Sequence, residues 1–346
     1  LFTSDYAYFS GFSSSWLIHS ERYVKEMIQR FKLDSSSYVI EVAANDGYLL
    51  QYVLREGIAC LGIEPTASTA HSAREKGIEI IERFFGIELA DQLVSQGRQA
   101  DLTVANNVLA HVPDINDFIK GFARLLKPNG VSTFEFPHLI NMVKEGQFDT
   151  IYHEHFSYLS LTAVDSIFRF NGMTIYDVKE LPTHGGSLRI FAQRSDSGIH
   201  PLSSAVTDML DRELIAGVKT DAYYLRFQEK ANRIKDDFIA FLIDAKREGK
   251  SVGAYGAAAK GCTLLNYAGI RRNLLPWVVD RNPAKCGKFL PGNRIPIVDE
   301  SRIREEQPNF VIILPWNLCD EVMEQLAYIR NWGGQFVIAI PEIKVL

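Results

Sequence analysis

The stretch YVIEVAANDG, residues 38–47, joins a short hydrophobic run to a turn of small and polar residues. The run predicts a buried strand, and the pattern that begins at about Gly47 predicts a helix directly after the turn. Ala43, Ala44 and Gly47 allow a ligand to approach the backbone closely, and the start of the helix offers free N–H groups. The turn therefore suits a nucleotide-like ligand, although the complete GxGxxG pattern of dinucleotide-binding folds is absent.

Polar residues also follow the neighbouring predicted strands. Glu64 directly follows the run 59–63. A carboxylate at this position can accept hydrogen bonds from both ribose hydroxyls of a ligand. Asn106 and Asn107 follow the run 102–105. Together with Glu41, these positions resemble the motifs of class I S-adenosylmethionine-dependent methyltransferases. The alternative is any other Rossmann-like strand and turn.

Short apolar runs and helical patterns alternate along the first half of the chain. Strands are expected at 38–42, 59–63, 78–81, 102–105 and 131–136, with helices between them. This alternation predicts a parallel α/β sheet with its ligands at the carboxyl ends of the strands. Two later runs, 173–180 and 187–193, predict an antiparallel hairpin that closes the sheet.

The second half repeats the alternation on a smaller scale. Strands are expected at 251–255, 277–280, 310–314 and 336–340, with helices after Ala258 and over 318–329. The predicted fold is therefore a Rossmann-like methyltransferase sheet closed by a hairpin, followed by a second, smaller Rossmann-like α/β domain. We expect an aromatic arm and helix at 1–35, the methyltransferase domain at 36–198, a helical connection at 199–250 and the C-terminal domain at 251–346. The candidate buried positions of the helical connection are Leu210, Leu214, Val218, Leu225, Ile234, Phe238 and Phe241.

Composition and charge exclude several protein classes. The chain has 346 residues and is 47% hydrophobic and 23% charged, which suits about two globular domains. Its net charge of −5 argues against binding to nucleic acid. No apolar run is long enough to cross a membrane, so we expect a cytoplasmic protein that does not bind membranes. The four cysteines are far apart and form no CxxC pair, which predicts reduced thiols and no metal site.

The loop Tyr152-His153-Glu154-His155 follows the fifth predicted strand, at the edge of the sheet where ligands bind. Two histidines beside a carboxylate provide a base near neutral pH and a group that orients it. The HEH spacing does not match the HExxH pattern of a helical zinc site. A surface histidine is the alternative, but Tyr6, Tyr8, His111 and His184 are expected near the same face, which favours catalysis.

A second small-residue turn lies in GAYGAAAKG, residues 253–261. Its backbone N–H groups and Lys260 could hold a pyrophosphate, although the GxxxxGK[ST] pattern of a P-loop is absent. Asp280 and Lys285 follow a neighbouring strand. From the residues alone, a turn that only packs a helix, with solvated lysines, is an equally good interpretation.

Several of these motifs occur in the order found in one known family. YAYFS at 6–10, the turn at 41–50, NNVLAH at 106–111, YHEHFSY at 152–158, HGGSLR at 184–189 and the segment 253–267 resemble the nucleotide-sugar C-methyltransferases, which modify 4-keto deoxyhexoses. The resemblance covers essentially the whole chain. Family members commonly carry a cysteine-ligated zinc module ahead of the aromatic arm. This chain lacks one, so it is either a fragment or a member without the module, and no zinc is expected.

The resemblance implies S-adenosyl-L-methionine as cofactor and a nucleotide diphosphate-sugar, expected to be dTDP-linked, as substrate. It implies transfer of a methyl group to C3 of a 4-keto-6-deoxysugar through an enolate, with His155 or Tyr152 as the general base; our hypothesis is His155, supported by Glu154. The expected catalytic residues are His155, Tyr152, Glu154, His111 and Tyr6. The expected cofactor-binding residues are Tyr8, Glu41, Ala43, Asn45, Gly47, Glu64, Asn106 and Asn107. The expected substrate-binding residues are His153, His184, Gly185, Tyr255, Gly256, Lys260, Asp280 and Lys285.

Three alternative functions can be separated by experiment. A sugar O-methyltransferase would use the same base on an alcohol, and would need neither a ketone nor solvent exchange of the C3 proton. An oxidoreductase acting on nucleotide sugars would bind NAD(P). A non-catalytic sugar-nucleotide-binding protein would show binding without turnover, which the clustered Tyr152, His155 and His111 disfavour.

Overall fold

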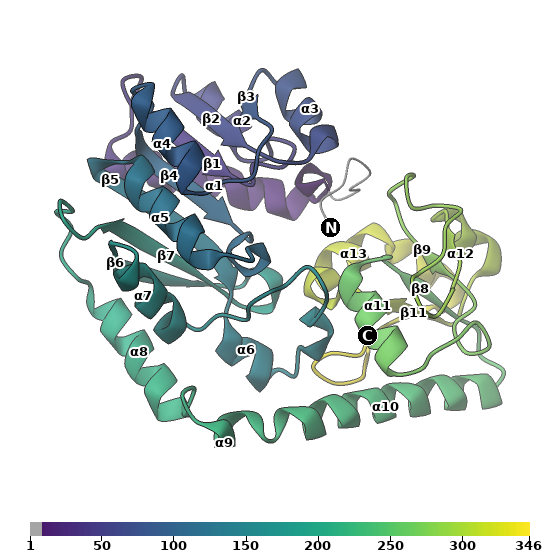
Figure 1. Cartoon of the computed structure of the whole chain (residues 1–346). Coiled ribbons are helices and arrows are strands. Elements are labelled where there is room, and N and C mark those ends of the chain that lie inside the picture. The colour runs from purple at the N-terminus through teal and green to yellow at the C-terminus, as the bar shows by residue number, and fades with distance from the viewer. Residues whose placement is uncertain (1–8) are drawn as a thin grey trace. The chain divides into compact units, whose positions relative to one another are not determined.

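The computed structural model describes residues 9–346, and these form two compact units (Figure 1). Unit 1 contains the described residues up to 139 together with residues 154–216. Unit 2 contains residues 140–153 and 217–346. The segment 140–153 thus belongs by its contacts to the C-terminal unit, and the chain returns to unit 1 at Glu154.

Unit 1 is built on a seven-stranded sheet with the strand order β3-β2-β1-β4-β5-β7-β6. The strands from β3 to β5 are parallel, whereas β7 is antiparallel to both of its neighbours. Their bounds are β1 Tyr38–Val42, β2 Ala59–Ile63, β3 Glu79–Ile81, β4 Ala100–Asn106, β5 Leu126–Pro137, β6 Met173–Leu181 and β7 Ser187–Arg194. This is the class I methyltransferase sheet that the sequence predicted, and the closing antiparallel hairpin is confirmed.

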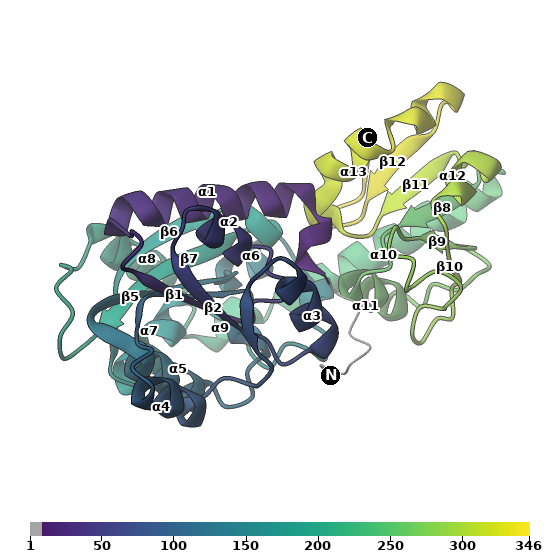
Figure 2. The same ribbon diagram turned by 90° about the horizontal axis from the view of Figure 1, so that it is seen from above.

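Helices cover both faces of this sheet, and each layer has its own hydrophobic core. The core on one face involves α1 Ser14–Phe31, α2 Leu50–Arg55 and α3 Ala67–Glu75; α1 lies along the sheet in Figure 2. The opposite core involves α4 Ile87–Ser95, α5 Ile115–Leu125, α7 Leu161–Phe170 and α8 Ser204–Ala216. The sheet is therefore buried on both sides, which explains why apolar residues predominate in its parallel strands.

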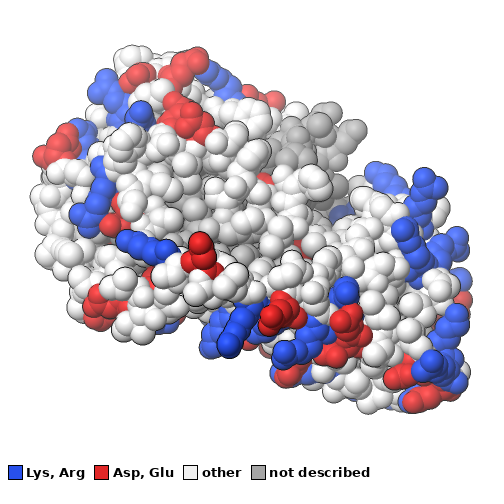
Figure 3. All heavy atoms as spheres, turned by 60° about the horizontal axis from the view of Figure 1, so that its bottom comes forward, with Lys and Arg blue, Asp and Glu red and all other residues white. Residues whose placement is uncertain are grey.

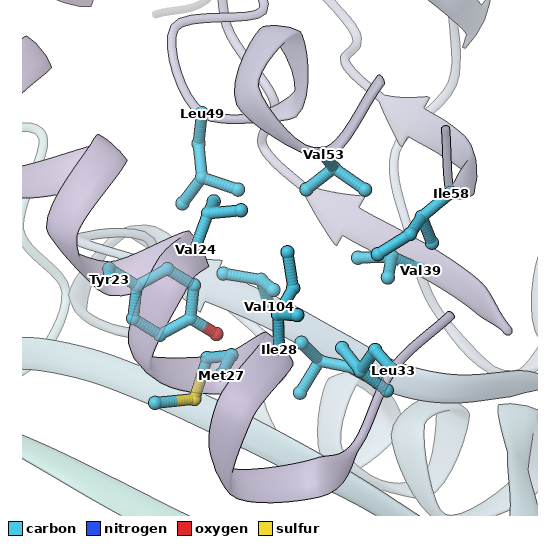
Figure 4. A pocket seen from close by; sticks show the side chains of 11 residues that line it. Tyr23, Val24, Met27, Ile28, Leu33, Val39, Leu49, Val53, Ile58 and Val104 are labelled. Carbon is cyan, nitrogen blue, oxygen red and sulfur yellow. The ribbon is translucent and has the colours of Figure 1, made fainter. Parts of the chain in front are cut away.

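A small apolar cavity lies between α1 and the sheet (Figure 4). Side chains of α1 such as Tyr23 and Met27 face Val39 and Val104 of the strands across it. No charged side chain lines the cavity, and the strand residues that line it precede the carboxyl ends of β1 and β4. It is thus an imperfection in core packing and separate from the predicted ligand edge.

Unit 2 contains a six-stranded sheet with the order β10-β9-β8-β11-β12-β13, parallel except for β13. Its strands are β8 Val252–Tyr255, β9 Val278–Val279, β10 Ile297–Val298, β11 Phe310–Ile313, β12 Gln335–Ile338 and β13 Lys344–Val345. The core on one face involves α10 Phe227–Arg247 and α11 Ala259–Tyr267, and the other involves α12 Ser301–Glu306 and α13 Cys319–Gln325. The second Rossmann-like domain is confirmed.

The segment 140–153 packs on the helices of unit 2. It contains most of α6, Leu139–Lys144, and the short 3-10 helix η3, Phe148–Thr150. Phe148 is buried in the core of α10 and α11, and its ring lies 5.1 Å from that of Tyr267. Lys230 of α10 donates a hydrogen bond to the backbone carbonyl of Lys144. The residues before the YHEH loop are therefore held by unit 2.

Parts of the predicted organisation were wrong. Leu214 and Leu225 were expected to be buried, but they are 66% and 71% exposed, because the helical stretch breaks into α8, α9 Asp221–Tyr224 and α10 and no core forms against those two residues. Strand β10 and helix α12 were not predicted, since both are too short to give a periodic pattern. The helix expected over 318–329 is interrupted: α13 ends at Gln325 and a 3-10 helix runs over Ala327–Trp332.

The surface and helices add three observations. In the face drawn in Figure 3, acidic and basic side chains are interspersed over much of the surface. Over residues 9–346, no helix is long and apolar enough to span a bilayer. Within the same range, His, Cys, Asp and Glu side chains form no group of three or more that could hold a metal ion.

Candidate active site

The turn after β1 adopts a backbone conformation that favours glycine, although only one of its three left-handed residues is glycine. Ala43, Asn45 and Gly47 have φ angles of 60°, 48° and 75°. Alternating left-handed residues turn the chain sharply, which opens the backbone at the carboxyl end of the strand. A Cβ atom at Gly47 would lie 2.4 Å from the Cδ1 atom of Ile78, so steric contact as well as φ requires glycine there.

Glu64 holds this turn in place. Its carboxylate accepts hydrogen bonds from the backbone N–H groups of Asn45 and Thr66, each at 2.9 Å. The side chain is buried, being only 5% exposed. Each carboxylate oxygen can accept more than one hydrogen bond, so Glu64 keeps acceptor capacity for a ligand.

The residues that follow the aromatic arm are attached to the same turn. The backbone N–H of Ser10 donates to the side chain of Asn45 at 2.9 Å, and that of Gly11 donates to Asp46 at 3.2 Å. Tyr6 and Tyr8, expected at the site, lie outside the described residues 9–346. These two hydrogen bonds attach Ser10 and Gly11 to the turn after β1.

Buried polar oxygens gather at the carboxyl ends of β1 and β4. Glu41 is completely buried, and its burial raises its pKa well above the ordinary value, against the effect of the Tyr48 hydroxyl beside it. Apart from the Tyr48 hydroxyl, which interacts with Glu41 and Asn106, the carboxyl oxygens of Glu41 and the side-chain carbonyl oxygens of Asn106 and Asn107 have no hydrogen-bond partner among the described residues. Buried acceptors of this kind are rare unless something satisfies them, so this edge fits a ligand that is rich in hydrogen-bond donors.

The cofactor expected from the sequence is rich in hydrogen-bond donors of this kind. S-adenosyl-L-methionine carries an ammonium group, two ribose hydroxyls and an adenine amino group, all of which donate hydrogen bonds. A cation near Glu41 would also favour its charged form and offset the effect of burial on its pKa. Among the expected residues, Glu41, Glu64, Asn106 and Asn107 offer acceptors at this edge that could hold such a ligand.

The hairpin between β6 and β7 brings a histidine to this edge. The side-chain amide nitrogen of Asn107 lies 3.0 Å from Nε2 of His184, which occurs in the left-handed conformation at φ 54° within the 3-10 helix Thr183–Gly185. The indole of Trp16, from α1, contacts the His184 ring edge to face at 5.1 Å. Residues from the expected cofactor and substrate sets are thus in direct contact.

A buried ionic network lies beneath this hairpin and was missed in the sequence. The Glu135 carboxylate accepts hydrogen bonds from Arg189 at 2.7 Å, from Thr183 at 2.7 Å and from the ring of His19 at 2.9 Å. Burial opposes ionisation of Glu135, but the His19 hydrogen bond and the Arg189 charge outweigh it and lower the pKa to about 2. The signal in the sequence was an acid inside the apolar run Phe134–Phe136.

The YHEH loop is attached to the segment that follows β4. The backbone N–H groups of Phe156 and Ser157 donate to the carbonyl of Ala110, at 2.7 and 3.3 Å. The rings of His111 and His155 meet edge to face with their centres 4.7 Å apart. Burial lowers the pKa of His111, against a hydrogen bond with the backbone of Glu154, so the ring is neutral at pH 7. Glu154 and His155 therefore lie in unit 1 beside His111, whereas Tyr152 and His153 belong to unit 2.

A second buried cluster fixes the far end of this loop. Glu213 of α8 accepts hydrogen bonds from the ring of His138 at 2.7 Å and from the backbone N–H groups of Leu161 and Thr162 at 2.6 and 2.7 Å. Its carboxylate thereby satisfies the free N–H groups at the start of α7. Helix α7 directly follows the YHEHFSY segment, so the position of that segment depends on Glu213, which the sequence did not reveal.

In unit 2, the expected substrate residues surround the turn between β8 and α11. Gly256 has φ 92°, and a Cβ atom there would lie 2.5 Å from the ring of Pro315. The Asp280 carboxylate accepts a hydrogen bond from the backbone N–H of Ala257 at 2.8 Å and pairs with Lys285 at 3.2 Å. Tyr255 instead packs in the core with α12 and α13, and its hydroxyl donates to Gln325.

Lys260 stands at the start of α11 with three neighbours. Its ammonium group donates to the side chain of Asn317 at 2.7 Å and lies 4.7 Å from the centre of the Trp316 indole. Burial lowers the pKa of Lys260, and the charge of Asp149 opposes this effect. Asp149 and Trp316 were not among the expected site residues, and no sequence motif marks either of them.

Comparisons with known proteins agree with this architecture. Residues 16–178 match a methyltransferase domain, and residues 182–341 match a C-methyltransferase C-terminal domain. The chain is 31% identical to the C-methyltransferase NovU from Streptomyces niveus over 341 residues, covering 99% of this chain and 81% of that protein. A ubiquinone biosynthesis O-methyltransferase from Chelativorans sp. (strain BNC1) is 31% identical over 97 residues, covering 27% of this chain and 37% of that protein.

Solved structures resemble about half of the chain. Magnesium protoporphyrin IX methyltransferase from Synechocystis PCC 6803 has a TM-score of 0.40 at 16% identity, over 52% of this chain and 79% of that one. The PH0226 protein from Pyrococcus horikoshii OT3 has a TM-score of 0.44 at 14% identity, over 54% and 95% of the two chains.

The relationship to NovU spans both units, so it covers the cofactor turn, the YHEH loop and the C-terminal sheet together. The protein is an enzyme, and its methyl donor is S-adenosyl-L-methionine. A methyltransferase, and neither an oxidoreductase nor a non-catalytic binding protein, is therefore the class to which the site belongs. The chain is a member of the C-methyltransferase family.

Proposed function

We propose that the enzyme transfers a methyl group from S-adenosyl-L-methionine to C3 of a nucleotide-linked 4-keto-6-deoxysugar. The single observation that carries the proposal is the contact between His155 and His111 beside the Ala110 carbonyl. His155, which we take as the general base, thereby lies beside the segment that follows β4, and Asn106 and Asn107 at the end of β4 carry acceptors that we assign to the cofactor. A base next to the methyl donor is what methylation at a weakly acidic carbon requires.

The reaction needs a nucleophilic carbon at the position next to a ketone. His155 removes the C3 proton, and the electron pair of the C–H bond moves into an enolate whose negative charge lies on the C4 oxygen. Glu154 supports His155 in this role, and Tyr152, His111 and Tyr6 hydrogen-bond the enolate or the sugar hydroxyls. The bound donor supplies a methyl group that is already activated as a sulfonium, so the enolate carbon can take it without a metal.

The electrostatic state of His111 suits this assignment. Because burial lowers its pKa, the ring is neutral at pH 7 and can donate a hydrogen bond without adding a positive charge beside His155. A second imidazolium 4.7 Å from the base would instead disfavour the protonated His155 that forms in the reaction. The reaction is accelerated further when the base, the sugar and the methyl donor are held in line.

The nucleotide part of the substrate is assigned to unit 2. The turn at Gly256, the start of α11 and the lysines Lys260 and Lys285 offer the N–H groups and cations that a diphosphate needs. His184 and Gly185, on the hairpin of unit 1, are assigned to the sugar, as is His153. We take dTDP as the nucleotide for testing.

The experiment that tests this proposal measures exchange of the C3 proton of the sugar with solvent. Wild-type enzyme is incubated in D2O with dTDP-4-keto-6-deoxyglucose and S-adenosylhomocysteine, and exchange at C3 is followed by NMR. Exchange that requires the enzyme and is lost in His155→Asn supports enolate formation by this base. In a parallel reaction with S-adenosyl-L-methionine in place of S-adenosylhomocysteine, methyl transfer to a hydroxyl without any exchange at C3 would instead identify an O-methyltransferase.

A further inference from the structure

Asp149 is a buried carboxylate in unit 2 that the mechanism above does not use. It lies in η3, is fully buried, and precedes Tyr152 of the YHEH loop by three positions. One of its oxygens accepts a hydrogen bond from the Trp316 indole at 2.8 Å, and the other has no hydrogen-bond partner in the described range 9–346. A buried acid with an unsatisfied oxygen is costly to keep, which points to a purpose other than packing.

Lys260 is the cation whose charge interacts with Asp149. The Trp316 indole donates to Asp149 through its nitrogen and faces Lys260 with its ring, so it lies in contact with both charged groups. Burial shifts the pKa of each group toward its neutral form, and the charge of the other group opposes that shift. Lys260 also donates to Asn317, next to Trp316 in the chain. Asp149, Lys260, Trp316 and Asn317 therefore form one cluster, which we call the Asp149 cluster.

The Asp149 cluster joins two parts of unit 2 that have different roles. Lys260 belongs to the start of α11, to which the nucleotide diphosphate is assigned above. Asp149 belongs to the segment that ends with Tyr152 and His153, and this segment is packed on α11 through Phe148 and Tyr267. A change at Lys260 can therefore reach Tyr152, which follows Asp149 by three positions in the chain.

We propose that Asp149 is a positioning residue that competes with the nucleotide diphosphate for Lys260, so that nucleotide binding resets the segment carrying Tyr152 and His153. This inference rests on the proposed function, because it takes the diphosphate to bind at Lys260. When an anion draws Lys260 away, Asp149 loses a cation of its cluster while it is still buried. The η3 turn then settles in a second arrangement and carries Tyr152 and His153 with it.

The competition has a measurable signature. In Asp149→Asn the side chain still accepts a hydrogen bond from Trp316, but the Asp149 cluster no longer holds a carboxylate charge that attracts Lys260. We expect dTDP to bind about threefold or more tightly to this variant than to wild type, because one competing charge has been removed. A residue with only a structural role would weaken binding or leave it unchanged.

The experiment combines calorimetric titration of the full chain with dTDP and hydrogen–deuterium exchange with and without dTDP. In wild type, dTDP should protect the backbone amides of 256–262 and also those of 148–153. In Asp149→Asn, protection of 256–262 should remain and that of 148–153 should be lost. Trp316→Phe removes the N–H donor and keeps the ring beneath Lys260, so it should lose the same protection. Asp236→Asn, an exposed position on α10, is the matched control and should behave as wild type.

Two outcomes count against the proposals, and they differ. If dTDP binds and protects 256–262 but never 148–153, or if Asp149→Asn and Trp316→Phe protect both segments as wild type does, the role of Asp149 is overturned and the nucleotide site stands. If neither dTDP nor UDP binds the wild-type chain, the nucleotide-sugar assignment itself fails, and the role of Asp149 fails with it.

Discussion

The side-chain amide nitrogen of Asn107 and Nε2 of His184 lie 3.0 Å apart, although 77 positions separate the two residues in the chain. An amide nitrogen can only donate, so Nε2 of His184 accepts and its ring proton resides on Nδ1. The pair joins the end of β4 to the hairpin between β6 and β7. The tautomer of a site histidine is thus fixed by a residue from the cofactor edge.

Replacing Asn107 with Asp should change the protonation of His184. A carboxylate of the same size cannot donate to Nε2, and its charge favours the imidazolium, so the pKa of His184 should rise by about 1 unit or more. NMR titration of the His184 ring measures this. Asn116→Asp changes an amide on α5 in the same way away from the site, and it should leave the His184 titration unaltered.

His155→Asn should remove most of the turnover while it preserves cofactor binding. Loss of a general base lowers kcat by about 100-fold or more, whereas the affinity for S-adenosylhomocysteine depends on other residues and should stay the same. Steady-state kinetics and calorimetry separate the two effects. The control is His71→Asn, since His71 is 74% exposed on α3; a near-wild-type kcat in His155→Asn would disprove the assignment of the base.

Gly47→Ala should abolish the cofactor turn. The new Cβ would meet Ile78 at 2.4 Å, and the left-handed φ of 75° adds strain of about 1 kcal/mol. We expect the affinity for S-adenosylhomocysteine to fall about tenfold or more, because a shifted backbone can no longer line the ligand. Gly57→Ala has nearly the same φ, 74°, but open space around it. It should therefore show the strain in its thermal stability and bind the ligand as wild type does.

Glu135→Gln should destabilise unit 1 strongly. The change leaves Arg189 buried without its carboxylate, which costs about 3–5 kcal/mol of the free energy of unfolding. Because the folded-state pKa of Glu135 is lowered to about 2, its stabilising contribution is present above the ordinary pKa near 4.5 and disappears as the pH falls toward 2. Urea unfolding at several pH values tests both statements. Glu180→Gln, which breaks the exposed pair with Arg212, should cost at most about 1 kcal/mol.

Asp149 should make stability depend on pH in the opposite direction to Glu135. Burial raises its pKa to about 6, against the effects of Lys260 and Trp316, so the folded state favours the protonated acid. Between the ordinary pKa near 4 and about 6, the folded state binds more protons than the unfolded state, and stability falls as the pH rises. Asp149→Asn should remove this dependence, so its stability relative to wild type should increase from pH 4 to pH 7. A constant difference over that range would contradict the buried titration.

The local sequence was sufficient for most of the elements and for the edge of the sheet at which the polar residues gather. Apolar runs and small-residue turns placed β1 and β2 at their observed bounds, and the order of the motifs indicated the family. These features depend on residues close in the chain: the period of the apolar positions fixes the element, and the end of each parallel strand fixes the ligand edge. The alternation of runs also predicted both sheets before any contact was known.

Contacts between distant residues were accessible only in the folded chain. The pairing of Asn107 with His184, the Glu135 network and the Asp149 cluster each join segments far apart in sequence, and none of them leaves a periodic pattern. Leu214 and Leu225 illustrate the same limit, since their apolar character indicated burial although no element covers them. Hydrophobicity and turn chemistry act along the chain, whereas burial and charge pairing depend on which surfaces meet, and that is determined by tertiary packing.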